Sequence, residues 1–300
     1  MILFAFETHA ATAAALQSAM GQLQLGRFQV ARFENGELHV EVETRCTAEH
    51  CVVLGSIAPP DEQLLSTLLL AHTLKKEGAS KVTAVLPYLG YARHDKDKPG
   101  QSIATAWAGS LVKASGCDEV ITVDAHSEKT KRLFPVPLVS LSPAAVFAEA
   151  MTRYGLARAT VVAPDEGAIG RCEAVRTAAG MAPGKVPYFE KRRTETGIIH
   201  AGPIGEVGRQ AVIVDDILDT GGTLVSACEK LSATGVEEVD VMVTHGLFTG
   251  TRWKDLYRFG VKRIFCTDSV PLPVGVDGDG IVRLSIIPLL AKELFAIDKK

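Results

Sequence analysis

One arrangement of polar and apolar residues occurs three times along the chain. A helix end is followed by a glycine, a short polar hinge and an apolar strand rich in β-branched residues, in residues 74–90, 112–127 and 231–246. Gly78, Gly116 and Gly235 stand where helix C-caps favour glycine. Strands that are apolar throughout are typical of parallel sheets covered on both faces. The pattern therefore predicts an alternating α/β chain.

The same alternation continues through the second half of the chain. Residues 159–167 predict a strand and a turn, and residues 168–180 predict a helix that Gly180 ends. Residues 140–143 form a natural boundary, because Pro143 suits the first turn of a new helix. We expect two similar α/β domains related by an approximate twofold, each a parallel sheet flanked by helices. Their expected ranges are 1–142 and 143–286, with the apolar tail 287–300 packed back onto the first.

Composition narrows the class of protein. The net charge is −3 and the pI about 6.3, so no basic field predicts a nucleic-acid partner. The six cysteines are scattered without a Cys-x-x-Cys pair, which argues against a disulfide framework or a zinc site. The N-terminus lacks the features of a secretion signal, and no apolar run approaches 18 residues. We expect a cytoplasmic protein without a membrane segment.

Polar residues gather directly after four of the predicted strands. They occupy residues 88–97, 124–127, 165–167 and 215–223. Ligands of open α/β sheets bind at the carboxyl ends of the strands. A ligand site built from these loops is therefore the leading prediction.

The most informative stretch is residues 212–224, which run VIVDDILDTGGTL. Val212–Val214 predict a strand, and a helix is expected from about Gly222. Backbone N–H groups of the turn at residues 220–223 could bind an anion at the helix N-terminus. Asp215 and Asp216 could accept hydrogen bonds from the vicinal hydroxyls of a ribose. A sugar phosphate satisfies both halves of the pattern, and the absence of Gly-Lys-Ser/Thr excludes a Walker loop.

This stretch resembles the phosphoribosyl pyrophosphate (PRPP) signature shared by type I phosphoribosyltransferases and PRPP synthetases. Further segments resemble ribose-phosphate pyrophosphokinases, in that family's order and over almost the whole chain. They read RFENGELHVEV (32–42), PYLGYARHDKDK (87–98), VDAHS (123–127), APDEGAIGR (163–171), YFEKRR (188–193), VTHGLFTG (243–250), TDSVP (267–271) and IIPLLAKEL (286–294). The resemblance implies transfer of the diphosphoryl group of ATP to the 1-hydroxyl of ribose 5-phosphate, which releases AMP.

The resemblance also implies roles for individual residues. Ribose 5-phosphate would be bound by Asp215, Asp216, Asp219, Thr220, Gly221, Gly222 and Thr223. ATP would be bound by Phe33, Asn35, Glu37, Arg93, His94 and Asp95, and Mg²⁺ by His126, Asp165 and Asp124. Lys191 and Arg193 would be catalytic, in a mobile loop after the strand that ends at Phe189. A homo-oligomer, a dimer or a hexamer, would share the ATP site between subunits.

Plainer explanations exist for some of these residues. Residues 34–37 suit a β-turn between strands, which could also present Phe33 and Glu37. Three adjacent cations at 191–193 are typical of a solvated surface, and a lone histidine at a strand end is often structural. A catalytically silent regulatory subunit is the non-enzymatic alternative, although it would be expected to lose the basic loop or the paired acids. An ordinary phosphoribosyltransferase would lack the N-terminal nucleotide segment.

The chain departs from the family pattern in several places. His94 replaces a glutamine, and Ala168 replaces the second glycine of a Pro-Asp-x-Gly-Gly pattern. Residues 96–107 lack the family's Ser-Arg-x-Pro-Ile-Ser pattern, and residues 124–134 differ from its Asp-Leu-His-Ala-x-Gln segment. Those segments help to form the regulatory site of the common class. We therefore expect weak or absent phosphate activation and ADP allostery.

Overall fold

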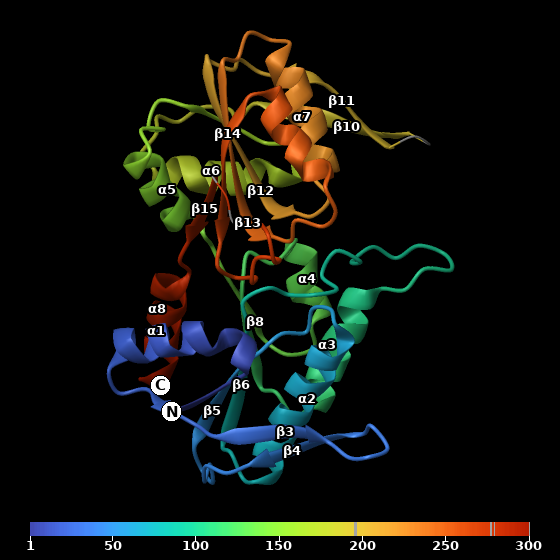
Figure 1. Ribbon diagram of the computed structural model, residues 1–300, viewed down its shortest axis with the longest axis vertical. Coiled ribbons are helices and arrows are strands. Elements are labelled where there is room, and N and C mark those ends of the chain that lie inside the picture. Colours follow the sequence, from blue (N-terminus) through green and yellow to red (C-terminus); the bar gives the residue numbers. More distant parts are fainter. Residues whose placement is uncertain (195–196, 277, 279, 300) are drawn as a thin grey trace. The chain divides into compact units, whose positions relative to one another are not determined.

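The computed structural model describes residues 1–194, 197–276, 278 and 280–299 (Figure 1). The chain divides into two compact units. The first comprises Met1–Leu141 together with Ile287–Lys300, and the second comprises Ser142–Ile286. Each unit is built around one parallel sheet and is described by itself.

The first unit contains a six-stranded sheet in the order β2-β1-β5-β6-β7-β8, and every neighbouring pair is parallel. Its strands are β1 (Ile2–Ala5), β2 (Gln24–Leu25), β5 (His50–Leu54), β6 (Lys81–Leu86), β7 (Glu119–Val123) and β8 (Leu138–Leu141). The central strands are apolar and buried along their length, because helices cover both faces.

The helices of this unit are η1 (Glu7–His9), α1 (Ala10–Met20), α2 (Asp61–Lys76), α3 (Ala104–Ala114), α4 (Glu128–Leu133) and α8 (Ile287–Asp298). Leu70 of α2 and Val112 of α3 join the core against strand residues such as Phe4. The C-terminal helix α8 lies against α1 (Figure 1). One Asp298 carboxylate oxygen is 3.7 Å from the N-terminal ammonium of Met1.

A separate antiparallel hairpin joins β3 (Phe28–Arg32) to β4 (Leu38–Val42). The turn between them closes with a hydrogen bond from the Phe33 N–H to the Glu37 carbonyl at 2.9 Å. Gly36 has a φ of 89°, which favours glycine at this position. The predicted β-turn is therefore confirmed.

The second unit contains a five-stranded parallel sheet in the order β15-β14-β13-β12-β9. Its strands are β9 (Thr160–Val162), β12 (Gln210–Leu218), β13 (Glu238–Gly246), β14 (Val261–Thr267) and β15 (Ile281–Leu284). Its helices are α5 (Ala144–Arg153), η2 (Glu166–Ala168), α6 (Ile169–Ala178), α7 (Gly222–Ser232) and η3 (Arg252–Phe259). The predicted fold class, α/β with two parallel sheets flanked by helices, is confirmed.

Strand β12 explains why a strand apolar on both faces is stable here. Ala211 and Ile213 pack in the core that contains α7 and η3, whereas Val212 and Val214 pack in the core that contains α5 and α6. All four side chains are fully buried. Alternation across the strand thus sends successive apolar residues into two different cores.

The glycines expected to end helices adopt the left-handed backbone. Gly78, Gly116, Gly180 and Gly235 have φ values of 87°, 87°, 65° and 85°. Gly78, Gly116 and Gly180 follow the ends of α2, α3 and α6 by two residues, and Gly235 follows the end of α7 by three. The C-cap residues themselves are Glu77, Ser115, Ala179 and Ala233, so the glycine follows the cap directly in the first three helices and by two residues in α7.

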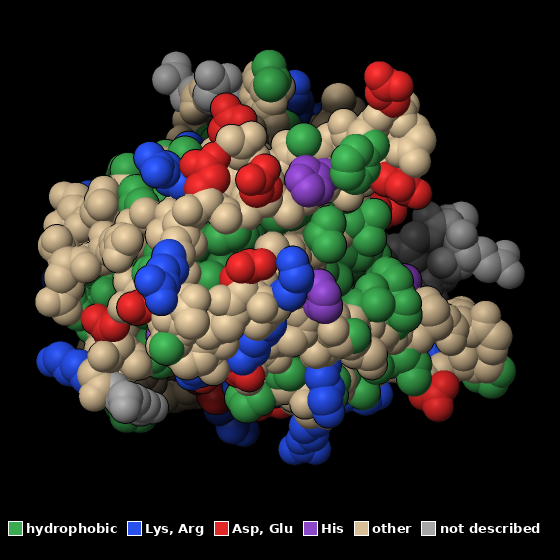
Figure 2. All heavy atoms as spheres, turned by 90° about the horizontal axis from the view of Figure 1, so that it is seen from below, with side chains coloured by type: hydrophobic (Ala, Val, Ile, Leu, Met, Phe, Trp, Pro, Cys, Tyr) green, Lys and Arg blue, Asp and Glu red, His purple; other side chains and the backbone are tan. Residues whose placement is uncertain are grey.

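All six cysteines are buried and carry free thiols. The face in Figure 2 carries acidic and basic side chains interspersed with hydrophobic ones, as expected for a small net charge. Among the residues that the structure describes, no helix is both long and apolar enough to cross a lipid bilayer.

Candidate functional site

The turn at residues 219–221 joins β12 to the N-terminus of α7, which begins at Gly222 as predicted. Gly221 is the N-cap of the helix and has a φ of 86°. A Cβ atom on Gly221 would lie only 2.7 Å from the Cα atom of Trp253. Glycine is thus required twice, by the backbone conformation and by the close approach of Trp253.

Strand β12 is longer than its apolar run predicts. Asp215 pairs with Val243, and Ile217 pairs with His245, so both adjacent carboxylates belong to the strand and not to the loop. The expectation that the strand ends at Val214 is wrong. Asp215 pairs with β13, whereas the Asp216 N–H donates to Asp215 Oδ1 at 2.9 Å, so one carboxylate satisfies the backbone donor of the next residue.

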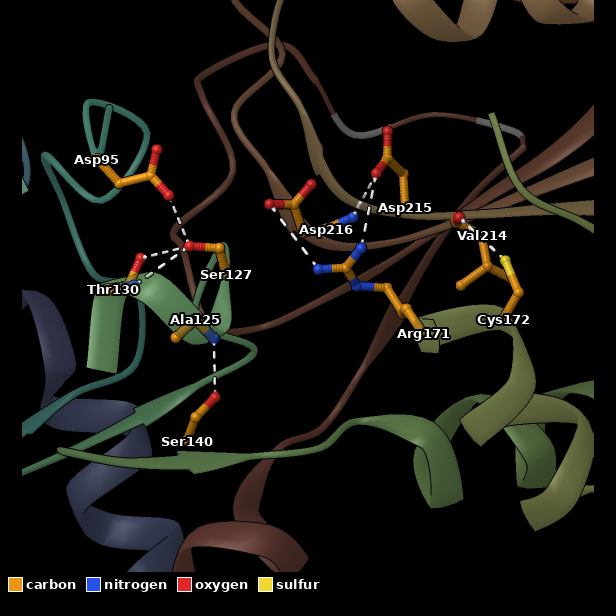
Figure 3. A network of polar contacts seen from close by, with 10 residues as sticks. All are labelled: Asp95, Ala125, Ser127, Thr130, Ser140, Arg171, Cys172, Val214, Asp215 and Asp216. Carbon is orange, nitrogen blue, oxygen red and sulfur yellow. Dashed lines mark hydrogen bonds and ion pairs between the residues drawn. The ribbon is translucent and has the colours of Figure 1, made fainter. Parts of the chain in front are cut away.

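The two carboxylates face a shared cation (Figure 3). Arg171 of α6 places Nη1 at 3.8 Å from Asp215 Oδ1 and Nη2 at 3.9 Å from Asp216 Oδ2. The three side chains are only 13%, 16% and 10% exposed. An arginine from a different element thus reduces the repulsion between adjacent acids.

Burial raises the pKa of Asp215 well above its usual value, and the Asp216 carboxylate raises it further. The guanidinium of Arg171 acts in the opposite direction. The sequence did not identify Arg171 as a site residue. The signal was present, because Arg171 is the only cation in the segment 163–171.

Asp165 lies just before η2 and is partly buried. Its backbone is extended, with φ −160° and ψ 176°. Ala168, which replaces a glycine of the family pattern, is 1% exposed and packs in the core with α5 and α6. The replacement is therefore accommodated by burial of its methyl group.

The first unit presents two polar loops at the carboxyl ends of β6 and β7. The loop after β6 holds Arg93 and His94 exposed, whereas Asp95 is only 5% exposed. Thr105 supports this loop, because its hydroxyl donates to the Tyr91 carbonyl at 3.0 Å and its N–H donates to the His94 carbonyl at 3.3 Å.

The loop after β7 begins at Asp124, which has the unusual φ of 47° for a non-glycine residue. Its N–H donates to the Leu141 carbonyl at 2.9 Å. The next N–H, that of Ala125, donates to the Ser140 hydroxyl at 2.9 Å (Figure 3). Strand β8 thus fixes the backbone that carries Asp124 and His126.

A short hydrogen bond joins these two loops. The Ser127 hydroxyl donates to Asp95 Oδ2 at 2.6 Å and accepts the Thr130 N–H at 3.2 Å, as the N-cap of α4 (Figure 3). Ser127 stands where the common family sequence has alanine. The sequence did not predict this contact, because hydrogen bonding between residues 32 positions apart has no local signature.

The hairpin turn holds the other residues expected on the ATP side. Phe33 is 56% exposed, and its ring centroid lies 5.2 Å from that of His39. The Asn35 side-chain carbonyl accepts the Glu37 N–H at 3.1 Å. The turn therefore presents an aromatic face and a carboxylate to solvent.

Lys191 and Arg193 belong to the antiparallel ribbon of β10 (Tyr188–Thr194) and β11 (Gly197–Ile204). Their backbones pair with His200 and Ile198. The expectation of a loop directly after Phe189 is wrong, because β10 continues to Thr194 and pairs with β11. The residue pattern of one strand does not reveal its pairing partner. The side chains of Lys191 and Arg193 lie outside the described structure.

No cluster of three or more potential ligands marks a metal site within the described ranges. Mg²⁺ does not require such a cluster, because it keeps several waters and binds substrate phosphates with one or two carboxylates. Asp124 and Asp165 offer the oxygen atoms that Mg²⁺ prefers. Each unit thus offers a carboxylate of the kind that suits Mg²⁺, Asp124 in the first and Asp165 in the second.

Comparisons with known proteins identify related families. The family model described as the N-terminal domain of ribose phosphate pyrophosphokinase matches residues 1–116. The model of the phosphoribosyl synthetase-associated domain matches residues 184–299. The first range contains four strands of the six-stranded sheet, and the second contains four strands of the five-stranded sheet.

Two relatives match nearly the whole chain. Ribose-phosphate pyrophosphokinase of Bacillus caldolyticus is 30% identical over 296 residues, which are 97% of this chain and 93% of that protein. Ribose-phosphate pyrophosphokinase 1 of Streptococcus pyogenes is 30% identical over 306 residues, covering 99% and 94%. The crystal structure of phosphoribosylpyrophosphate synthetase from Mycobacterium smegmatis superimposes with a TM-score of 0.87, 25% identity and coverage of 99% and 98%.

Proposed function

This chain belongs to the ribose-phosphate pyrophosphokinase family, and on that premise we propose that it converts ATP and ribose 5-phosphate into PRPP and AMP. The observation that carries the proposal is the turn at residues 219–221, which joins the strand that carries Asp215 and Asp216 to the N-terminus of α7. The 1-hydroxyl oxygen forms a bond to the β-phosphorus of ATP. The bond between that phosphorus and the α,β-bridging oxygen breaks, AMP leaves and the hydroxyl proton is released.

Ribose 5-phosphate is proposed to bind at this turn. The N–H groups at the start of α7 and the hydroxyls of Thr220 and Thr223 suit a phosphate. The carboxylates of Asp215, Asp216 and Asp219 suit the ribose hydroxyls. Gly222 leaves space beside the backbone, whereas Gly221 permits the turn through its positive φ and the close approach of Trp253.

ATP is proposed to bind to residues of the first unit. Phe33, Asn35 and Glu37 on the hairpin turn would supply stacking and hydrogen bonding to the base. Arg93 would donate a bidentate pair of hydrogen bonds to a phosphate. His94 and Asp95 complete the proposed set on the same loop.

Mg²⁺ is proposed as the metal, held by Asp124, Asp165 and His126 with the phosphates of ATP. When bound, it neutralises charge on the phosphate oxygens. The support is the oxygen chemistry of the two carboxylates and the fixed backbone after β7. His126 is proposed for the same region on the family resemblance.

Lys191 and Arg193 are proposed as catalytic residues. Cations that meet the transferring group stabilise the charge that develops in the transition state. The proposal rests on the family resemblance, in which the first and third basic residues of this run act.

Assembly and regulation follow the same premise. We propose a homo-oligomer, a dimer or a hexamer, whose subunits share the ATP site, with weak phosphate activation and ADP inhibition. The exposed Phe33 ring supports a shared site, because it leaves an aromatic surface available to a neighbour. Light scattering of the purified protein would give the oligomeric state.

The first experiment supplies ATP, Mg²⁺ and ribose 5-phosphate and measures AMP and PRPP together. Lys191→Ala is expected to lower kcat by about 10²- to 10³-fold, the usual loss for one transition-state contact. Lys185→Ala is the matched control, because Lys185 is an exposed lysine outside the basic run. No PRPP from the wild type, despite ribose 5-phosphate binding, would refute the proposed function.

A further inference from the structure

The segment that follows β13 is tied to the sugar-phosphate turn. The N–H groups of Leu247 and Phe248 both donate to the Leu218 carbonyl, at 2.8 and 3.1 Å. The Thr249 N–H donates to the Asp219 carbonyl at 3.1 Å. Three backbone hydrogen bonds therefore fix this segment against the end of β12 and the first residue of the turn.

Trp253 anchors the end of the same segment. It is 4% exposed, its indole N–H donates to the Gly250 carbonyl at 3.1 Å, and its ring packs edge-on against Phe248. Its Cα atom lies 2.7 Å from the position that a Cβ atom on Gly221 would occupy. The start of η3 is thus held directly against the turn.

Arg252 precedes this anchor and reaches across the open side of the turn. Its Nη1 lies 3.4 Å from the position of a Cβ atom on Gly222, and its Cζ lies 3.7 Å from it. The Thr220 hydroxyl oxygen is 4.0 Å from the same point. A guanidinium and a hydroxyl therefore converge on space that the glycine leaves empty.

The side chain of Arg252 is exposed and forms no ion pair or hydrogen bond with the described part of the chain. Other arginines of this unit are engaged, such as Arg263, which pairs with Asp240. An uncommitted guanidinium beside N–H groups at a helix N-terminus is matched to an anion with several oxygen atoms.

We propose that Arg252 binds the 5-phosphate of ribose 5-phosphate and so selects a phosphorylated sugar. The inference rests on the proposed function, which places the sugar phosphate at this turn. It assigns the specificity to a side chain outside the turn's own sequence. The N–H groups of α7 bind one side of the phosphate, and the guanidinium binds the side that faces η3.

The test compares Arg252→Ala with Lys254→Ala. Both changes remove one positive charge from an exposed residue of η3, but Lys254 lies over the Trp253 ring, with Nζ 5.6 Å from its centroid. Arg252→Ala is expected to raise the KM for ribose 5-phosphate by about 10- to 100-fold, the range for a hydrogen bond to a charged group. The KM for ATP and the urea midpoint should stay unchanged, and Lys254→Ala should leave every value near that of the wild type.

Calorimetric titration without ATP provides a second readout. Ribose 5-phosphate should bind the wild type more tightly than unphosphorylated ribose. Arg252→Ala should reduce that ratio of affinities by about 10- to 100-fold, as expected for the KM. Arg252→Lys should recover part of it, because charge remains while the planar pair of donors is lost. Loss of binding in Arg252→Ala would support the inference even if the wild type made no PRPP.

Three results would overturn the inference and leave the proposed function intact. The first is PRPP synthesis with an unchanged KM for ribose 5-phosphate in Arg252→Ala. The second is a rise in the KM for ribose 5-phosphate that is equally large in Lys254→Ala. The third is a lower kcat without any change in the binding of either sugar.

Discussion

Gly221→Ala tests the close contact on which the sugar-phosphate turn depends. A Cβ atom there would lie 2.7 Å from the Trp253 Cα atom and 3.0 Å from its Cβ atom. Carbon atoms in ordinary contact stay about 3.5 Å apart, so the turn or the start of η3 must move by roughly 0.8 Å. Both partners are tied down, because Trp253 is buried and the neighbouring backbone is hydrogen-bonded to β12.

Gly235 provides a matched control in the same unit. Its φ of 85° is nearly the 86° of Gly221, but a Cβ atom there would have nothing within 4 Å. Alanine at either position costs about 1–2 kcal/mol for the left-handed backbone. Only Gly221→Ala adds the cost of overpacking, about 1–3 kcal/mol. The free energy of unfolding should therefore differ between the two variants by about 1–3 kcal/mol.

Urea unfolding followed by tryptophan fluorescence can measure this difference in one unit. The chain has two tryptophans, Trp107 in the first unit and Trp253 in the second. A Trp107→Phe background leaves Trp253 as the reporter, and Trp107 is half exposed, so its removal should be tolerated. In the same background, Gly221→Ala should lower kcat/KM for ribose 5-phosphate by about 100-fold, because displacements near 1 Å have that effect. Equal urea midpoints for Gly221→Ala and Gly235→Ala would refute the steric reasoning.

The remaining predictions concern other contacts of the two units. Arg263→Met should destabilise the protein by about 3–5 kcal/mol, because it leaves the fully buried Asp240 without its bidentate partner. In urea unfolding, the double variant Arg263→Met with Asp240→Leu should recover most of the lost stability. Ser127→Ala should lower the free energy of unfolding by about 1–3 kcal/mol and raise the KM for ATP, because it removes the hydrogen bond to Asp95. Ser127→Thr should keep both values near wild type. An unchanged KM in Ser127→Ala would show that this bond does not position the nucleotide loop. Asp215→Asn should abolish turnover yet raise the thermal midpoint at neutral pH. Because the pKa of Asp215 is raised on folding, the folded protein binds more protons than the unfolded chain at pH values between the two pKa values. The free energy of unfolding therefore falls as pH rises from the unfolded pKa through the folded pKa of Asp215. The advantage of asparagine should therefore shrink as pH falls toward 3.8, and a constant advantage would contradict this account.

The sequence by itself determined the class of fold. Strands that are apolar on both faces are stable only between two layers of helices, so β5, β6 and β12 predict parallel sheets without further information. The positive φ of Gly116 and Gly235 follows from local backbone sterics, as does the turn before α7. Such features depend on neighbours within a few positions.

Only the tertiary structure decided which partners the predicted site residues meet within each unit. Arg171 meets Asp215 and Asp216 from another helix, and Ser127 meets Asp95 across 32 positions of the chain. Pairing with β13 likewise extends β12 past its apolar residues, and pairing with β11 makes residues 191–193 part of strand β10. These outcomes depend on partners that hydrophobic periodicity does not encode, because hydrogen bonds and ion pairs form between whichever side chains the packed helices and strands bring together.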